Sequence, residues 1–219
     1  MLNYLLIKYK EYIKTIETLN TRIQQELLMT IINEKDGKVY LERLLEKYSA
    51  FFDIKKEYDY HGIKFSAYAY FHSLNEKYVL TRKANLWRAK AFEHVLFLEV
   101  ERVDEDLIEK LRKLIKEYME PELVRGGNKY PCEDHMYSYL TLVILSKEKI
   151  ENDMIRAVRR FHFDKGYLFS FRGHSEAHIA CVDMESELVY TNFAAREMKK
   201  TLQSVFEEKK IEAVPQRGI

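Results

Sequence analysis

Residues 58–71 read Tyr-Asp-Tyr-His-Gly-Ile-Lys-Phe-Ser-Ala-Tyr-Ala-Tyr-Phe, and in this stretch the spacing of apolar side chains becomes that of β-strands. Apolar residues occupy alternate positions on both sides of the His61-Gly62 pair. A period of two is typical of a half-buried strand, and a glycine-containing pair between two such runs is typical of a hairpin turn. The stretch therefore predicts an antiparallel hairpin.

The chain before this hairpin has helical spacing. Apolar side chains recur every three or four residues from Leu5 to Ile31, stop at Asp36-Gly37, and resume from Leu41 to Phe52. Such stripes predict amphipathic helices, so we expect a helical arm over residues 1–50. The spacing from Leu5 to Ile23 is nearly heptad. It favours either a homodimer formed through this N-terminal helix or packing of the helix on its own sheet.

The chain after the hairpin alternates between strand and helix patterns, which predicts an α+β fold. We expect short strands at residues 78–80, 95–100, 137–145 and 188–191, and two further strands joined near Gly173. Helices are expected over residues 82–92, from Asp104 to Pro121, over residues 150–161 and after Asn192. Their predicted N-caps are Thr81, Asp104 and Asn192.

An internal repeat relates two parts of the chain at an offset of 111 residues. Gly62 matches Gly173 and Phe52-Asp53 matches Phe163-Asp164, without gaps. We therefore expect two related sheet-and-helix units with antiparallel hairpins that arose by duplication; the alternative is two unrelated stretches with similar turn residues. With a linker over 120–134, the predicted organisation is a helical arm over 1–50 and units over 51–125 and 126–219, or one continuous globular domain.

The composition limits the compartment and the class of partner. Lys plus Arg number 36 and Asp plus Glu number 35, a balance that argues against a dedicated nucleic-acid or membrane-surface binder. The two cysteines, Cys132 and Cys181, do not make a disulfide framework. No apolar run approaches the roughly 20 residues of a membrane span, and the N-terminal run ends at Lys8, too early for a signal peptide. We therefore expect a cytoplasmic protein.

Histidine and glutamate side chains cluster after Gly173. On a strand, Glu176 and His178 would project from the same face. Together with His174 they would supply three ligands of a transition metal and leave a fourth position for water, which is the arrangement of a metal-dependent hydrolase. The alternative is a polar turn that leads to a strand with His178 on its outer face.

A second polar cluster precedes the strand expected at residues 137–145. Cys132, Asp134 and His135 follow Pro131 closely, and a thiol beside an imidazole can bind metal or form a Cys-His nucleophile. Arg172 and Asp183, on either side of the histidine motif, are further candidates for a polar site. The alternative is that Asp134 only forms a turn.

Specific catalytic signatures are absent from the sequence. Gly126-Gly127 is not followed by the Lys-Ser or Lys-Thr of a phosphate-binding loop, and no Gly-x-Ser-x-Gly motif occurs. The leading hypothesis is therefore a ligand- or protein-binding module without catalytic activity or cofactor. The metal-dependent hydrolase is the second hypothesis. Basic residues such as Arg156, Arg159 and Arg160, with tyrosines on the strands, make a nucleic-acid-associated protein the third. Whether the chain is an enzyme stays open.

Three stretches resemble a prokaryotic family described only as a domain of unknown function. They are Tyr-Val-Leu-Thr-Arg-Lys-Ala-Asn-Leu-Trp at 78–87, His-Met-Tyr-Ser-Tyr-Leu-Thr at 135–141, and residues 171–192, where Val-Asp-Met precedes Val-Tyr-Thr-Asn. The resemblance covers about residues 50–195. It implies the two-part α+β layout and no particular activity.

Overall fold

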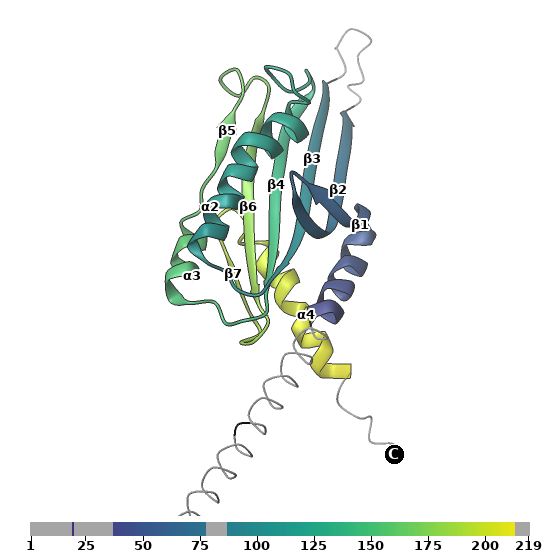
Figure 1. Ribbon diagram of the computed structural model, residues 1–219. Helices are drawn as coiled ribbons and strands as arrows, with labels where there is room; N and C mark the ends of the chain where they lie inside the picture. Colours follow the sequence, from purple (N-terminus) through teal and green to yellow (C-terminus); the bar gives the residue numbers. More distant parts are fainter. Residues whose placement is uncertain (1–18, 20–36, 78–86, 213–219) are drawn as a thin grey trace, which may run out of the picture.

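The computed structural model describes Leu19, residues 37–77 and residues 87–212, and its strands form one sheet (Figure 1). Within these ranges the sheet has seven strands in the order β1-β2-β3-β4-β6-β5, with β7 also paired to β6. The strands are β1 (Asp53–Tyr60), β2 (Ile63–Lys77), β3 (Trp87–Val100), β4 (His135–Ser146), β5 (Asp164–Gly166), β6 (His174–Asp183) and β7 (Leu188–Thr191).

Strand direction divides the sheet into two parts. The predicted hairpin is confirmed as β1 and β2, and β3 continues it antiparallel. β3, β4 and β6 run parallel to one another, so the chain must cross over between them. The first crossover is α2 (Glu105–Lys113) followed by the π-helix η1 (Leu114–Val124), and the second contains α3 (Asn152–Arg159).

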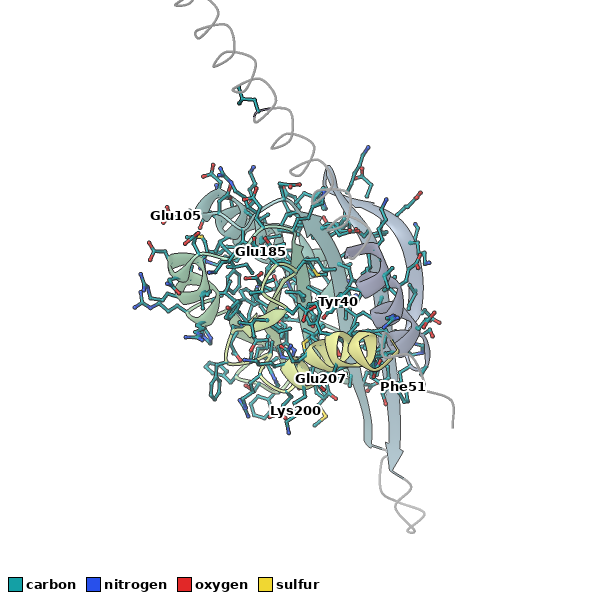
Figure 2. All side chains as sticks on the ribbon, turned by 90° about the horizontal axis from the view of Figure 1, so that it is seen from below. Tyr40, Phe51, Glu105, Glu185, Lys200 and Glu207 are labelled. Carbon is teal, nitrogen blue, oxygen red and sulfur yellow. The ribbon has the colours of Figure 1, made fainter. Side chains whose placement is uncertain are left out.

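Helices cover both faces of the sheet. The helices α2, η1 and α3 pack on one face, against buried side chains such as Leu96, Leu142 and Ile179. Helical residues 37–49 and α4 (Met198–Glu212) pack on the other face, against Phe97 and Val143 (Figures 1 and 2). This double cover explains why every residue from 140 to 146 is buried.

Several local predictions are confirmed. Asp104 caps α2, since its Oδ1 accepts a hydrogen bond of 2.8 Å from the backbone N–H of Leu107. The second helix of the predicted arm is present over residues 37–49; the first lies outside the described residues apart from Leu19. None of the helices in the described ranges has both the length and the apolar character needed to cross a membrane.

The helix predicted over residues 82–92 is wrong for residues 87–92, which begin β3. Arg88, Ala89, Lys90 and Ala91 favour helix individually, but pairing with β2 along the whole strand outweighs that preference. The strand predicted at residues 78–80 and the Thr81 cap lie outside the described residues.

Two predicted helix boundaries are also wrong. Pro121 lies inside η1 instead of ending it, and the π-helix continues to Val124. Asn192 does not cap a helix directly, because α4 begins only at Met198.

The predicted duplication is not confirmed by the topology. Gly62 and Gly173 do both occupy turns before a long strand, with positive φ values. The element after the first hairpin is the strand β3, whereas the second hairpin is followed by β7 and α4. The sheet also runs without interruption across the two expected units, because β3 pairs with β4.

The side chain of Asn192 joins the backbone of β6 to the segments at Phe161 and Ala195 by hydrogen bonds. Its buried side chain accepts hydrogen bonds from the backbone N–H groups of Ile179 (3.0 Å) and Ala195 (3.1 Å). It donates to the carbonyl groups of Ala177 (2.9 Å) and Phe161 (3.2 Å). One amide therefore satisfies four backbone groups that water does not reach.

We predict that Asn192→Ala lowers the free energy of unfolding by about 3 kcal/mol, because several buried backbone groups lose their partners. Urea denaturation measures this change. Asn128→Ala is the matched control: that amide donates to two carbonyl groups at the surface, and its loss should cost less than about 1 kcal/mol. Equal costs for the two variants would contradict the assignment.

Candidate functional site

A pocket of about 590 Å³ opens on the face of the sheet that carries α2 and η1. Tyr70 of β2 and Phe92 of β3 form one wall, and Leu123 and Val124 at the end of η1 form another. The 125–134 loop, which leads from η1 to β4, closes the pocket with Tyr130, Pro131, Cys132 and Glu133. Arg172, from the loop between β5 and β6, completes the lining. The pocket thus lies where β4 and β6 begin.

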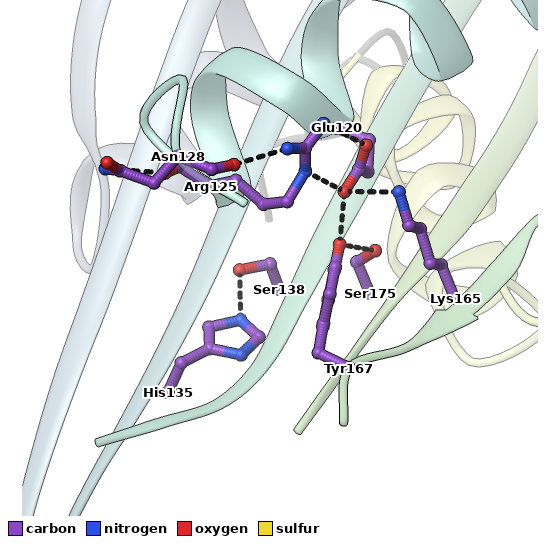
Figure 3. A network of polar contacts seen from close by, with 8 residues as sticks. All are labelled: Glu120, Arg125, Asn128, His135, Ser138, Lys165, Tyr167 and Ser175. Carbon is purple, nitrogen blue, oxygen red and sulfur yellow. Dashed lines mark hydrogen bonds and ion pairs between the residues drawn. The ribbon is translucent and has the colours of Figure 1, made fainter. Parts of the chain in front are cut away.

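A buried polar network lies beside this pocket (Figure 3). Its centre is Glu120 of η1, whose side chain is only 2% exposed. The carboxylate accepts hydrogen bonds from Arg125 Nε (2.7 Å) and Tyr167 OH (2.8 Å) and pairs with Lys165 Nζ at 3.0 Å. Tyr167 OH also lies 2.8 Å from Ser175 Oγ. The network joins η1, the 125–134 loop, β5 and β6.

These contacts fix the charge of Glu120. Burial by itself would raise the pKa of its carboxyl group, but hydrogen bonds from Arg125, Tyr167 and Lys165 outweigh burial and hold the pKa below the ordinary range. The carboxylate is therefore ionised at neutral pH and shared by two cations.

The π-helix directs two acidic side chains to opposite neighbours. Glu120 points to β5 and β6, whereas Glu122 accepts a hydrogen bond from Tyr60 OH (2.9 Å) and pairs with His61 Nε2 (2.9 Å) in the β1–β2 hairpin. A regular α-helix would rotate the two side chains differently, and π-helical turns are frequently found at functional sites.

His135 connects the two loops that border the pocket. Its Nδ1 lies 2.8 Å from the carbonyl oxygen of Arg172, so Nδ1 carries the proton. Nε2 then accepts a hydrogen bond from Ser138 Oγ at 2.9 Å. Burial lowers the pKa of His135, which keeps the ring neutral. Both ring nitrogens are occupied, so His135 is not a base for Cys132.

Arg172 is held in place by a strained loop. Leu168, Phe169 and Ser170 have φ values of 48°, 54° and 68°, a left-handed conformation that costs about 1–2 kcal/mol for each such residue. The loop closes through a hydrogen bond of 3.0 Å from Tyr167 N to Gly173 O. A Cβ atom on Gly173 would lie 2.1 Å from the carbonyl oxygen of Met136, so this position requires glycine.

The structure brings together four of the five residues predicted for the second polar cluster. Arg172 donates to Pro131 O (3.0 Å) and to Glu133 Oε1 (3.2 Å), next to Cys132, and His135 binds its backbone. Asp134 pairs with Lys90 at 3.6 Å. Asp183 is not part of the cluster. It lies at the opposite end of the sheet, where it accepts hydrogen bonds from the backbone N–H groups of Ile150 and Ser186.

The side chains predicted to bind metal lie on the other face of β6. As expected, Glu176 and His178 occupy alternate positions of one strand, and His174, two positions earlier, is the first residue of that strand. His178 Nε2 is 3.7 Å from Glu176 Oε2, and its ring stacks on Tyr139. Across the described ranges, no three His, Cys, Asp or Glu side chains are grouped so that they could hold a metal ion.

A neutral histidine supports the wall formed by β2 and β3. His94 is the cross-strand partner of Tyr70, with ring centroids 4.9 Å apart, and its Nδ1 is 2.7 Å from Tyr68 OH. Burial lowers the pKa of His94 to about 4, so the imidazole is neutral at pH 7.

The sequence patterns do not indicate the centre of this site. Glu120 falls where the expected helix, which ends at Pro121, meets the expected linker over 120–134, and its partner Tyr167 lies 47 positions away in the chain. No spacing in the sequence relates the two. Only the crossover geometry of the sheet brings them together.

Comparisons with known proteins identify a family and nothing more specific. The model of the family described as a domain of unknown function (DUF8052) matches residues 36–204, which confirms the resemblance to an uncharacterised family. No curated protein and no solved structure matches the chain.

We predict that Glu120→Gln lowers the free energy of unfolding at pH 7 by about 2 kcal/mol, because the two cations lose their shared anion. The pKa of Glu120 is lowered by folding, so this contribution is complete above the unfolded value of about 4.3 and is lost as the pH falls through the folded value. Urea unfolding at pH 7, 5 and 3 should show the gap between the wild type and Glu120→Gln narrowing as the pH falls below the unfolded value of about 4.3.

The control for this series is Glu109→Gln, since Glu109 lies at the surface of α2 and pairs with Arg112. Its free energy of unfolding should differ little from that of the wild type at all three pH values. A gap between wild type and Glu120→Gln that is the same at pH 7 and pH 3 would refute the ionised, paired state of Glu120.

Proposed function

We propose that this chain, which belongs to the family described as a domain of unknown function (DUF8052), is a binding module that takes a small molecule into the pocket between η1, β2, β3 and the 125–134 loop. The observation that carries the proposal is the combination of an apolar pocket with a buried polar network at its edge. Rigid neighbours of this kind keep a pocket open before its ligand arrives, which lowers the cost of binding.

The size and lining of the pocket support this function. Its volume of about 590 Å³ falls within the range of roughly 300–1,000 Å³ for small-molecule sites. Three aromatic rings and several aliphatic side chains line it, together with a few polar groups, which is the usual composition of such sites.

Binding is favoured over catalysis because the reactive groups are occupied. His135 uses one ring nitrogen on Arg172 and the other on Ser138, so it does not activate the thiol of Cys132. The hydrolase hypothesis based on His174, Glu176 and His178 has no grouped set of ligands within the described ranges to support it. Both cysteines are free thiols, which supports a cytoplasmic location.

The proposal is tested with N-phenyl-1-naphthylamine, a neutral dye whose fluorescence rises in apolar surroundings. Cys132 is exposed in the pocket lining, whereas Cys181 is buried, so N-ethylmaleimide should modify Cys132 alone. We predict that the native chain binds the dye and that a single maleimide adduct, verified by mass, abolishes binding by filling the pocket.

The matched control is Cys132→Ser, which should bind the dye equally well before and after the same treatment. Tyr70→Ala should weaken binding, whereas Tyr190→Ala, at a half-buried tyrosine on β7, should leave it unchanged. If the labelled wild type binds the dye as well as the unlabelled protein, the pocket is not a binding site and the proposal fails.

A further inference from the structure

We infer that the pocket selects planar aromatic molecules that carry an anionic group. This inference rests on the proposed function and specifies the class of ligand. Two features of the lining support it, the orientation of the aromatic rings and the unused hydrogen-bond donors of Arg172.

The rings on the aromatic wall of the pocket lie nearly parallel to one another. The ring planes of Tyr70 and Phe92 differ by only 13°, and their centroids are 6.5 Å apart. The imidazole of His135 continues this orientation at 10° from Phe92, so three adjacent strands present nearly parallel rings. Parallel rings of this kind favour another planar ring in the same orientation over packing with a branched aliphatic molecule.

Two guanidinium groups line the same pocket, and one of them, that of Arg172, has N–H groups available to a ligand. Arg172 uses two of its five N–H donors within the described part of the chain, on Pro131 O and Glu133 Oε1. Arg125 also lines the pocket, and it is oriented by the bond from its Nε to Glu120. A carboxylate, sulfonate or phosphate group can accept hydrogen bonds from the remaining N–H groups of Arg172.

The charge of the site favours an anion over a cation. Glu120 is shared by Arg125 and Lys165, which leaves positive charge in excess around it. Glu133 supplies a carboxylate to the lining, but its side chain is 85% exposed and already pairs with Arg172. The ammonium group of Lys129 lies over the ring of Tyr130 at the rim and adds to the positive charge.

The experiment compares two dyes that share one aromatic skeleton. N-phenyl-1-naphthylamine is neutral, whereas 8-anilinonaphthalene-1-sulfonate carries one negative charge. We predict that the native chain binds the sulfonate about tenfold more tightly at low salt, because a charge-assisted hydrogen bond is worth that much. This advantage should shrink as the salt concentration rises, while the affinity for the neutral dye stays constant.

Variants locate the source of the preference. Arg172→Met should remove most of the advantage of the sulfonate over the neutral dye, whereas Arg172→Lys should keep part of that advantage. The matched control is Arg156→Met, because Arg156 is an exposed arginine of α3 that pairs with Asp153. That variant should bind both dyes as the wild type does.

Three outcomes would overturn the inference. They are equal affinity of the wild type for the two dyes, an equal loss of both dyes in Arg172→Met, and sulfonate binding that survives the maleimide adduct on Cys132. Each of these outcomes leaves the proposed function standing, provided that the adduct still blocks the neutral dye. If the neutral dye does not respond to the adduct, the proposed function itself fails.

Discussion

The buried carboxylate of Glu120 is the constraint on which the arrangement of this molecule depends. A carboxylate that is almost fully removed from water must be matched by hydrogen bonds and positive charge, and any missing partner is expensive. Here the partners come from three separate parts of the chain: Arg125 after η1, Lys165 on β5, and Tyr167 in the loop that follows β5. Because these partners must all contact one carboxylate, they determine where the first crossover ends and where β5 lies. The pocket is formed between these elements.

The same network explains how the protein tolerates a strained loop beside the pocket. Three consecutive non-glycine residues from Leu168 to Ser170 are left-handed, and strain of this kind persists only where the surroundings determine the backbone. Tyr167 enters the loop bound to Glu120 and Ser175, and Gly173 leaves it against the backbone of Met136. With both ends held, the loop has no relaxed alternative. It presents Arg172 to the 125–134 loop, and this contact gives the pocket its polar side.

Elements that were predicted from the sequence are those specified by nearby residues. The β1–β2 hairpin follows from alternation around His61-Gly62, α2 from its Asp104 cap, and β7 from its short apolar run. The start of β3 was missed because Ala89, Lys90 and Ala91 are helix formers, and only the partner strand β2 makes them extended. The clustering of Cys132, Asp134, His135 and Arg172 could be anticipated from polar composition, but the neighbouring network around Glu120 could not. That network depends on a parallel crossover, whose geometry no local pattern encodes.

The direction of the parallel strands bears on where a ligand can bind. Open α/β sheets usually bind ligands at the carboxyl ends of their strands, but here those ends are closed. Backbone hydrogen bonds extend the sheet beyond β3, β4 and β6, from Lys147 to Val100 and from Met184 to Ser146, and the fully buried Asp183 satisfies the N–H groups of Ile150 and Ser186. At the amino ends of β4 and β6, the 125–134 loop and Arg172 line the pocket. The π-helix η1 leads into this loop and is held on both sides, by Glu120 to Lys165 and Tyr167 and by Glu122 to the β1–β2 hairpin. The pocket therefore lies at the less usual end of the parallel strands.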